Sequence, residues 1–353
     1  MRKKIVCFVL IFTLMLTTAA CSLVGSEQNS GLTRYQAGFF DTFDTYIQII
    51  IYAEDRETFD AHFNAAREAF RYYHMLFDIF SAHDGVNNIY TINAEAGIAP
   101  VLVDAAIIEL LILSQAAYFD TDGVLDITLG PVLSVWRRYR QAAISHPEYA
   151  SLPDIETLTA ASELRGIHHL HIDPVAQSVF LEHRGMQLDV GATAKSFAAS
   201  RVATLLYERG VRAAVINAGG DVIVMGKSQT AGGRPWNIGV QHPSGAGLID
   251  SVLVENKAVS TSGGDKRQFL VDDISYHHII NPATLMPASG FLSVTVAHED
   301  AMVAEILSTA LFILPFERGY NLAKQAGAAV LWVFEDASVA HNEYYRNISQ
   351  NFS

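Results

Sequence analysis

The order of strand-like and helix-like segments constrains the fold of this chain more than any other feature. Residues 43–52 alternate in polarity and are rich in β-branched side chains, which predicts a strand. Residues 55–79 and 104–119 carry apolar side chains at helical spacing. Strands and helices then interleave to the end of the chain without a regular strand–helix–strand order, and no repeats occur. The pattern therefore predicts a mixed α/β fold in one compact domain.

The remaining segments follow the same two patterns. A polar stretch at 141–153 links Trp136 to the next expected helix, at 155–164. Further helices are expected at 155–164, 195–209, 302–314 and 316–326. Further strands are expected at 169–173, 178–182, 186–190, 213–217, 237–241, 251–255, 258–261, 291–297 and 328–334.

The N-terminus has the layout of a secretory signal peptide. Arg2, Lys3 and Lys4 precede an apolar run over residues 5–16, and small residues follow at 17–20. The apolar run is too short to form a stable membrane-spanning helix. Residues 1–20 are therefore predicted to be a signal peptide.

Cys21 would be the first residue of the mature chain. The only other cysteine is Cys7, inside the leader, so the mature chain can form no intramolecular disulfide. Cys21 resembles the acylated cysteine of bacterial lipoproteins, which predicts a lipid anchor on the extracytoplasmic face of the cell membrane. The alternative is plain secretion with a free thiol. Residues 21–34 are expected to be the lipidated cysteine and a polar tether, and residues 35–353 the folded domain.

The charge balance excludes one class of function. The chain has 24 basic and 37 acidic residues, a formal charge of −13 and an isoelectric point near 5.4. A general nucleic-acid-binding protein needs a basic surface to neutralise phosphates, so no nucleic-acid partner is expected. Half of the 353 residues are hydrophobic, which is enough for a sizeable core.

Residues 188–199, LDVGATAKSFAA, are similar to a phosphate-binding loop. Such a loop in an NTPase has glycine, four residues, a second glycine, then lysine and serine or threonine. When the motif is aligned on Lys195 and Ser196, the glycine positions hold Asp189 and Ala194. A carboxylate at the first position would repel phosphate, which excludes the NTPase interpretation. What remains is a helix start that attracts anions, with Lys195 on its first turn, or an ordinary turn with a solvated lysine.

Three further motifs are weak when taken singly. The two glycines before Asp221 allow close backbone approach to a ligand, but they are also a common hairpin signal. His278, ahead of an Asn-Pro turn, is either a general base or a structural histidine. Glu305 and Thr309 share one face of an apolar helix. They would suit a hard cation such as Mg²⁺, or they mark a solvent-facing edge.

A transition-metal site is one interpretation of the stretch His168-His169-Leu170-His171. Alternation along a short strand would send neighbouring histidines to opposite faces. No cysteine or carboxylate cluster accompanies the stretch in the sequence. We therefore do not expect a metal at these histidines.

In this order, the motifs resemble those of the ApbE-type FAD:protein FMN transferases, from about Phe43 to Leu314. The family's motifs and their counterparts here are Met-Gly-Thr at residues 43–45, a segment ending in Ile-Asn at 81–93, Asp-Gly-Ala-Phe-Asp-x-Thr-x-Gly-Pro at 122–131 ahead of Trp136, Asp-Leu-Gly-Gly-Ile-Ala-Lys-Gly at 189–196, Asn-x-Gly-Gly-Asp at 217–221, Thr-Ser-Gly at 261–263, His-Ile-Ile-Asp-Pro at 278–282, and Asp-x-x-x-Thr at 305–309.

The resemblance implies a single α/β domain that binds FAD with Mg²⁺ and transfers FMN to a Thr or Ser hydroxyl of another protein. The product bond is a phosphoester, and AMP is released. The implied partners are FAD and an acceptor protein, either a subunit of a membrane redox complex or an extracytoplasmic flavoprotein. The implied site residues are His278 as the base, the carbonyl of Ala192 with Glu305 and Thr309 as metal ligands, and Phe43, His83, Val124, Leu125, Asp126, Asp189, Lys195 and Ile279 as contacts to FAD.

Among the departures from the family pattern, three bear on the chemistry of the implied site. Glu305 stands where the family has aspartate, His83 where it has tyrosine, and Asn281 where it has aspartate. Two alternatives therefore remain beside FMN transfer. One is Mg²⁺-dependent hydrolysis of FAD to FMN and AMP, and the other is a lipoprotein that binds FAD without turnover.

Overall fold

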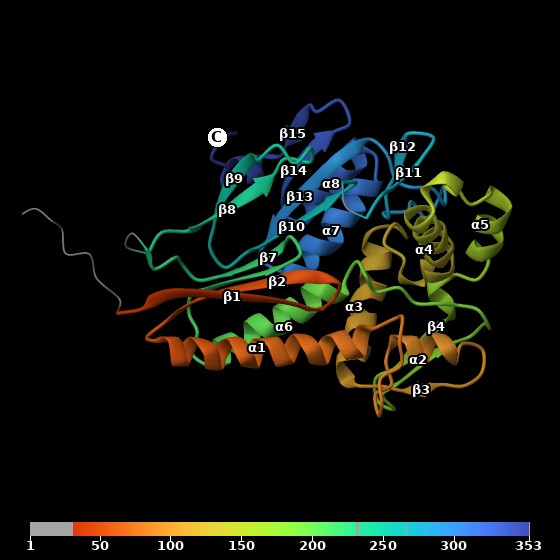
Figure 1. Ribbon diagram of the computed structural model, residues 1–353, viewed down its shortest axis with the longest axis horizontal. Helices are drawn as coiled ribbons and strands as arrows, with labels where there is room; N and C mark the ends of the chain where they lie inside the picture. Colours follow the sequence, from red (N-terminus) through yellow and green to blue (C-terminus); the bar gives the residue numbers. More distant parts are fainter. Residues whose placement is uncertain (1–30, 231–232, 266, 353) are drawn as a thin grey trace, which may run out of the picture.

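The computed structural model describes residues 31–230, 233–265 and 267–352. The predicted signal peptide, Cys21 and most of the predicted tether lie outside these residues. Among the described residues, no helix combines the length and the apolar character needed to cross a membrane. The described chain has the mixed α/β architecture that the segment pattern predicts (Figure 1).

An eight-stranded sheet with antiparallel neighbours forms the centre of the molecule. These strands lie in the sheet in the same order as in the chain, but long insertions separate some neighbours, such as β2 and β6. In spatial order the strands are β1 (Thr33–Thr42), β2 (Thr45–Ala53), β6 (Ala214–Ala218), β7 (Asp221–Met225), β10 (Ala258–Gly263), β13 (Phe291–His298), β14 (Ala329–Phe334) and β15 (Val339–His341).

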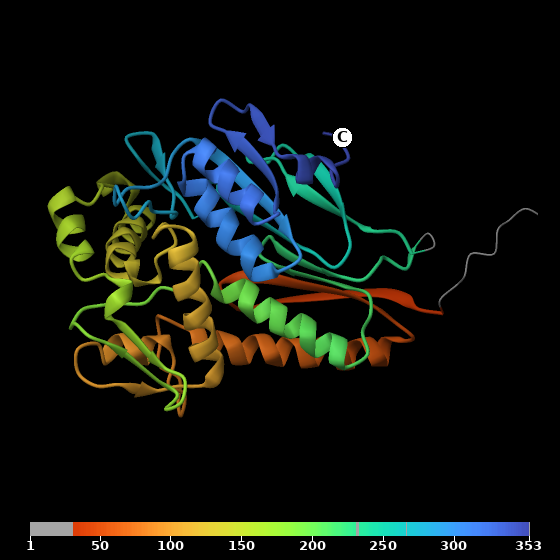
Figure 2. The same cartoon turned by 180° about the vertical axis from the view of Figure 1, so that it is seen from behind.

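One face of the sheet is covered by helices, which Figure 2 shows from their own side. Helices α1 (Arg56–Phe77) and α6 (Ala194–Glu208) pack over β1, β2 and β6 through apolar residues such as Ile49, Phe70 and Val202. Helices α7 (Ala301–Ile313) and α8 (Phe316–Gln325) cover β13 and β14. This face therefore buries two neighbouring cores that meet where α6 contacts α7.

The opposite face is covered by a hairpin and the C-terminal segment. Strands β8 (Trp236–Gln241) and β9 (Leu248–Val254) form the hairpin, and α9 (Glu343–Arg346) lies beside it. Trp236, Val252 and Tyr345 are buried against valines of β6 and β7. The central strands are consequently buried on both faces, which explains their runs of consecutive apolar residues.

A group of helices and short strands packs beside the sheet, at the right of Figure 1. It contributes the loops that approach the central strands from the side. Its elements are α2 (Ile89–Ala94), β3 (Val101–Leu102), α3 (Ala105–Asp120), α4 (Gly130–Ser145), α5 (Ile155–Ser162), β4 (Leu170–Asp173), β5 (Ser178–Leu181), β11 (Phe269–Val271), β12 (Ile274–Tyr276) and the short 3₁₀ turns Ile127–Leu129, Pro147–Tyr149 and Ile167–His169.

Side-chain caps define where several helices begin. Asp55 accepts a hydrogen bond from the backbone N–H of Thr58 at 2.8 Å, and α1 follows it directly. Asp104 and Asp300 cap α3 and α7 in the same way. These aspartates satisfy N–H groups that have no partner within the helix, so the predicted starts of the three helices agree with the structure within two residues.

Some predicted boundaries are wrong. The sequence pattern places Phe43 on a strand, but Phe43 and Asp44 form the turn between β1 and β2, with φ of 54° and 48°. Strand β1 begins at Thr33, so the last two residues of the predicted tether belong to the sheet. Both errors have the same cause. The β-branched pattern is present in β2 but not in β1, because β1 is more polar and largely exposed.

Two further differences lie close to the candidate site. Residues 186–190 are predicted to form a strand, yet they run as an irregular segment whose backbone is held by other elements. The sequence pattern does not predict the helix at 130–145, and the polar stretch assigned to 141–153 in fact begins inside α4. Gly130 and Pro131 open this helix, and such residues weaken a helical pattern even though proline suits a first turn.

Candidate active site

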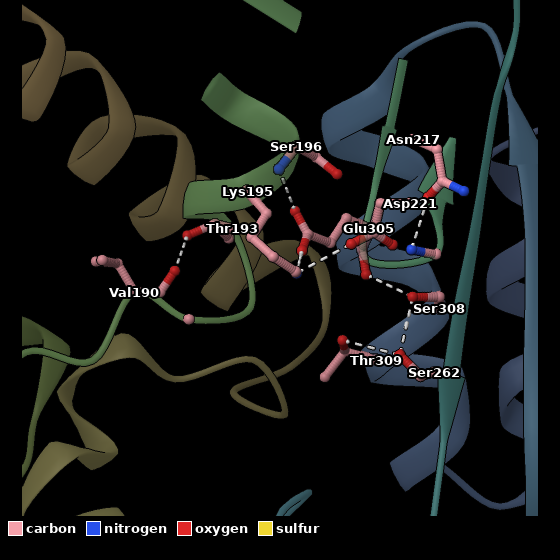
Figure 3. Close-up of polar contacts among 12 residues, drawn as sticks. Val190, Thr193, Lys195, Ser196, Asn217, Asp221, Ser262, Glu305, Ser308 and Thr309 are labelled. Carbon is pink, nitrogen blue, oxygen red and sulfur yellow. Dashed lines mark hydrogen bonds and ion pairs between the residues drawn. The ribbon is translucent and has the colours of Figure 1, made fainter. Parts of the chain in front are cut away.

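Three charged side chains from distant parts of the chain meet at one end of the central strands (Figure 3). Lys195 lies in the first turn of α6, Asp221 opens β7, and Glu305 lies in the second turn of α7. Lys195 Nζ lies 2.6 Å from Glu305 Oε1 and 3.0 Å from Asp221 Oδ2. The backbone N–H of Ser196 donates to Glu305 Oε2 at 2.9 Å. Both oxygens of Glu305 are therefore held by the start of α6.

The cluster is buried and carries more negative than positive charge. Glu305 is 3 % exposed and Asp221 7 %. Burial alone would lower the pKa of Lys195, but attraction to Asp221 and Glu305 outweighs it and raises that pKa above its usual value. Burial raises the pKa of Glu305, and Asp221 adds to this, while Lys195 opposes it. Two carboxylates share one ammonium group, so the cluster has room electrostatically for a second cation.

Three hydroxyl groups extend this cluster along α7. Ser262 of β10 places its Oγ 2.9 Å from Ser308 Oγ and 3.2 Å from Thr309 Oγ1. Ser308 also donates to the backbone carbonyl of Glu305 at 2.9 Å. The side chains meet because α7 packs against β10 and β13 along its length. Glu305 and Thr309, both expected as metal ligands, therefore lie in one oxygen-rich region.

The third expected metal ligand, the carbonyl of Ala192, lies in the turn that leads into α6. Thr193 and Ala194 both donate backbone N–H groups to the carbonyl of Val190, at 3.0 and 2.8 Å, which folds the turn back on itself. Carboxylate, hydroxyl and carbonyl oxygens are the ligands that Mg²⁺ prefers. Each carboxylate oxygen of Glu305 keeps a second acceptor position beside its present partner. The residues present thus fit a hard divalent cation.

A tight turn between β6 and β7 presents Asp221. Asn217 Oδ1 accepts a hydrogen bond from the N–H of Gly220 at 2.9 Å. Gly219 has φ of 67°, and a β-carbon at this position would lie 2.2 Å from Thr45 Oγ1. Only glycine can therefore occupy position 219 without moving Thr45. Gly219, the first of the two glycines noted in the sequence, thus permits close packing of this turn against Thr45 of β2.

A cavity of about 750 Å³ opens beside the loop that carries Asp189. Its walls come from the β1–β2 turn, α2, α4 and the irregular segment before Asp189, and include Asp44, Asn93, Arg137, Arg138, Arg140 and Leu188. A volume of this size accommodates a drug-sized or cofactor-sized ligand. The arginines of α4 give one wall a positive charge.

The segment 188–191 is held in place on both sides of Asp189. Asn93 accepts a hydrogen bond from the N–H of Leu188 at 2.7 Å and donates to its carbonyl at 3.0 Å. Asp189 pairs with Arg137 and accepts the N–H of Gly191 at 2.9 Å. Gly130 permits close packing of α4, because a β-carbon there would lie 2.3 Å from the Gln187 carbonyl. Residues 186–190, predicted to form a strand, are thus held by contacts to α2 and α4 instead of strand pairing.

The expected flavin contacts Phe43 and His83 both lie beside His74. The ring centroids of Phe43 and His74 are 5.4 Å apart, and those of His74 and His83 are 6.4 Å apart. His74 Nδ1 accepts the N–H of Phe43 at 3.3 Å, and His83 Nε2 lies 3.0 Å from Asp78 Oδ2. The structure therefore joins the β1–β2 turn to the segment after α1.

The expected contacts at 124–126 form the approach to a 3₁₀ turn. Asp126 accepts hydrogen bonds from the N–H and the hydroxyl of Thr128, at 2.8 and 2.6 Å. Burial raises the pKa of Asp126, and its hydrogen bonds to Thr128 only partly oppose this. Leu125 is buried, whereas Val124 is half-buried. The backbone N–H of Asp189 donates to the carbonyl of Ile127 at 2.8 Å, so this segment adjoins the Asp189 loop.

His278 and Ile279 follow β12 in a segment held by His277. The N–H of Ile279 donates to His277 Nδ1 at 3.2 Å, and His277 Nε2 lies 2.9 Å from the carbonyl of Ala288. Because Nδ1 accepts a hydrogen bond, His277 is neutral and carries its proton on Nε2. Burial accordingly lowers the pKa of His277. His278 is half-buried in the same segment.

The predicted site residues omit several residues of this region, among them Asp221, Arg137 and His74. Asp221 belongs to a motif seen in the sequence, and its position after two glycines is the available signal. Arg137 follows Trp136 on a helix that the sequence does not reveal, so nothing in the sequence indicates its contact with Asp189. His74 lies near the end of α1 within an apolar helical pattern, which gives it no signal either.

Comparison with known proteins places this geometry in a family. The model of the ApbE family matches residues 43–332. A relative from Klebsiella pneumoniae (strain 342), named FAD:protein FMN transferase, is 32 % identical over 70 % of this chain and 75 % of its own length. A relative of the same name from Treponema pallidum (strain Nichols) is also 32 % identical, over 74 % of each chain.

Solved structures agree with the sequence relatives. The crystal structure of the ApbE protein from Thermotoga maritima is similar with a TM-score of 0.79 and 28 % identity, covering 89 % of this chain and 99 % of its own. The flavin transferase ApbE from Vibrio cholerae has the same fold, with a TM-score of 0.75, 21 % identity and coverage of 90 % and 100 %. With the family match extending over most of the described residues, this chain belongs to the ApbE family.

Proposed function

We propose that this chain is an FAD:protein FMN transferase, which moves FMN from FAD to a Thr or Ser hydroxyl of an acceptor protein. Relatives that are 32 % identical over most of the chain carry this name. The observation that carries the proposal is the buried cluster of Lys195, Asp221 and Glu305 at the start of α6. Its charge and oxygen donors suit a site for a metal and a pyrophosphate.

The cavity beside Asp189 is the proposed binding site for FAD. It borders the β1–β2 turn that carries Phe43, and it reaches Leu188, which precedes Asp189. Three arginines of α4 line its wall, at positions 137, 138 and 140. Guanidinium groups suit phosphate oxygens and also stack on aromatic rings. The proposed contacts to FAD remain Phe43, His83, residues 124–126, Asp189, Lys195 and Ile279.

Mg²⁺ is the proposed metal, held by the Ala192 carbonyl, Glu305 and Thr309. When bound, it would supply charge neutralisation at the pyrophosphate. Lys195 stays protonated at neutral pH, because both carboxylates raise its pKa. A fixed ammonium group at the start of α6 can therefore bind phosphate oxygens and stabilise the charge that builds up on them during transfer.

The transfer itself is a displacement at the phosphorus of the FMN half of FAD. The acceptor hydroxyl oxygen forms a new bond to this phosphorus, and the bond from the phosphorus to the bridging oxygen breaks. The bridging oxygen leaves with AMP. His278 is the proposed base that accepts the proton of the hydroxyl, because an imidazole has a pKa near neutrality. The product is a phosphoester between FMN and the acceptor.

The proposed location is the extracytoplasmic face of the cell membrane, where a lipid on Cys21 would hold the protein. The leader and the lone cysteine support this location. The polar residues that follow Cys21 would separate the anchor from the sheet, which begins at Thr33. The acceptor would then be an extracytoplasmic flavoprotein or a subunit of a membrane redox complex.

A direct assay tests the function. The purified protein is incubated with FAD, Mg²⁺ and a candidate acceptor domain, and flavin fluorescence of the denatured acceptor is recorded in a gel together with AMP release. Labelled acceptor and AMP in equal amounts are expected. AMP with free FMN and no labelled acceptor would instead identify a hydrolase. Bound and unchanged FAD would identify a storage protein, and a protein that binds no flavin would refute the proposal.

A further inference from the structure

A second group of potential metal ligands lies on the hairpin of β4 and β5 and shares no residue with the cluster at α6. His169 ends the 3₁₀ turn before β4, and Glu182 and His183 follow β5 directly. The N–H of Glu182 donates to the carbonyl of His169 at 3.0 Å, and Leu170 pairs with Leu181 in the ladder. The hairpin therefore brings the two ends of the stretch 169–183 side by side.

The side chains converge on one carboxylate. His169 Nδ1 lies 2.9 Å from Glu182 Oε2, and His171 Nε2 lies 3.3 Å from the same oxygen. The rings of His169 and His183 have centroids 4.3 Å apart. One ligand atom from each of His169, Glu182 and His183 lies within 4.8 Å of the other two. Two imidazoles and a carboxylate thus surround a single small volume, with a third imidazole at its edge.

The ring nitrogens and the carboxylate oxygen of this group lie close enough together for one divalent cation to contact them all after small side-chain movements. A divalent cation lets every imidazole stay neutral and bind through a ring nitrogen. His171 of β4 adds a third imidazole, because its Nε2 also lies beside Glu182 Oε2.

We propose that His169, Glu182 and His183 form a binding site for a divalent transition metal of the Zn²⁺ class, with His171 or water as the fourth ligand. Zn²⁺ takes imidazole nitrogens and carboxylate oxygens at about 2.0–2.2 Å in a tetrahedral arrangement. Ligand atoms around it are then separated by about 3.3 Å, close to the contacts that already exist. Glu182 and His183 are exposed, so the remaining adjustment costs only changes of rotamer.

The sequence predicts no metal at these histidines, and the structure shows why this reasoning is incomplete. His168, the neighbour of His169, does point elsewhere and contacts Phe119, with ring centroids 6.1 Å apart. The missing carboxylate comes from the far strand of the hairpin. Strand pairing, which the sequence does not display, supplies both Glu182 and His183.

A metal here would fasten two segments that lead to the candidate active site. Gly166, just before the turn that carries His169, donates its N–H to Thr128 Oγ1 at 3.0 Å, and the Thr128 hydroxyl donates to Asp126. His183 precedes the irregular segment that ends at Asp189. The proposed role of the metal is therefore structural, and it is independent of the FMN transfer. Imidazole ligands favour Zn²⁺ over Mg²⁺, which distinguishes this site from the oxygen-rich cluster at Glu305.

Titration of the untagged full-length protein with Zn²⁺, in a buffer with excess Mg²⁺, tests the site. We expect one Zn²⁺ per chain by calorimetry and a rise in melting temperature on Zn²⁺ addition. His169→Ala and His183→Ala should each weaken this binding at least about tenfold and remove the Zn²⁺-dependent rise in melting temperature. His168→Ala is the matched control, since it removes an exposed histidine next to the site, and it should bind Zn²⁺ as the parent does.

Two results would overturn the proposal. One is Zn²⁺ affinity that is the same in His183→Ala, His169→Ala and His168→Ala, which would place the metal elsewhere. The other is the absence of stoichiometric binding in the parent protein. Circular dichroism of the variants without metal confirms that they fold. Because the readouts are binding and melting temperature, the result does not depend on whether the protein transfers FMN.

Discussion

Lys195 Nζ lies 2.6 Å from Glu305 Oε1, although 110 residues separate the two along the chain. The first turn of α6 also donates the N–H of Ser196 to the second oxygen of the same carboxylate. Asp221 completes the group from the β6–β7 turn. This contact connects the loop that carries Asp189 to the helix that carries the proposed metal ligands. We therefore expect a change at Lys195 or Glu305 to affect the loop and the proposed metal site together.

Replacing Lys195 with alanine should weaken both FAD binding and the fold. Glu305 and Asp221 would be left as buried carboxylates without a counter-ion, a change that costs about 3–5 kcal/mol of unfolding free energy in comparable sites. Urea unfolding and FAD titration measure the two effects. Lys324→Ala, which removes an exposed lysine of α8, is the control. Unaltered FAD affinity in Lys195→Ala would remove this lysine from the site.

Glu305→Gln should abolish the Mg²⁺ dependence of activity and turnover with it. The amide keeps the size of the side chain but removes the charge that a hard cation requires. Glu305→Asp, which installs the residue typical of the family, should retain Mg²⁺-dependent activity. Activity is measured as flavin fluorescence on the acceptor across a range of Mg²⁺ concentrations. Mg²⁺-dependent turnover that persists in Glu305→Gln would refute the ligand role of Glu305.

Gly219→Ala should destabilise the protein by about 2–3 kcal/mol through a clash with Thr45 added to backbone strain at positive φ. Gly210→Ala separates the two effects, because Gly210 has φ of 93° and no atom lies within 4 Å of the position that an added β-carbon would take. It should cost only about 1 kcal/mol. Denaturant midpoints measure both. Equal losses in the two variants would mean that packing against Thr45 is unimportant.

His277 should make the protein less stable as the pH falls from about 7 toward 5. Burial holds its folded-state pKa below the ordinary 6.5, so in this window the unfolded chain binds a proton that the folded chain does not. Stability is therefore lost as the pH falls through 6.5. His277→Gln should show a shallower dependence of unfolding free energy on pH, whereas His146→Gln, at an exposed position, should match the parent. A parent-like slope in His277→Gln would contradict this assignment.

Cys21→Ser should release the protein from the membrane fraction of cells that express the full chain. The substitution removes the thiol that a lipid would acylate, and a myristoyl-sized chain or larger provides most of the membrane affinity. Fractionation followed by immunoblotting measures the distribution. Since Cys21 lies before the described fold, in vitro FMN transfer by the variant should be unchanged. A variant that remains in the membrane fraction would exclude lipidation at this cysteine.

Local patterns in the sequence determined much of the fold. Apolar spacing predicted α1, α3, α6, α7 and α8, and the structure shows aspartate caps at the starts of three of them. Helix periodicity and capping depend on residues within one or two turns, so they can be read from the sequence directly. The order of the motifs likewise predicted the family and the fold class, which the comparisons confirm.

Only the tertiary structure decided which side chains meet. The packing of α6 against β7 placed Asp221 beside Lys195, α4 brought Arg137 to Asp189, and a hairpin joined Glu182 to His169. Phe43 became a turn residue because β1, polar and exposed, still pairs with β2. Such contacts depend on how buried surfaces pack between segments far apart in the chain. No local pattern encodes that packing. The sequence alone therefore indicated which side chains could take part in the site, but not which of them lie in contact.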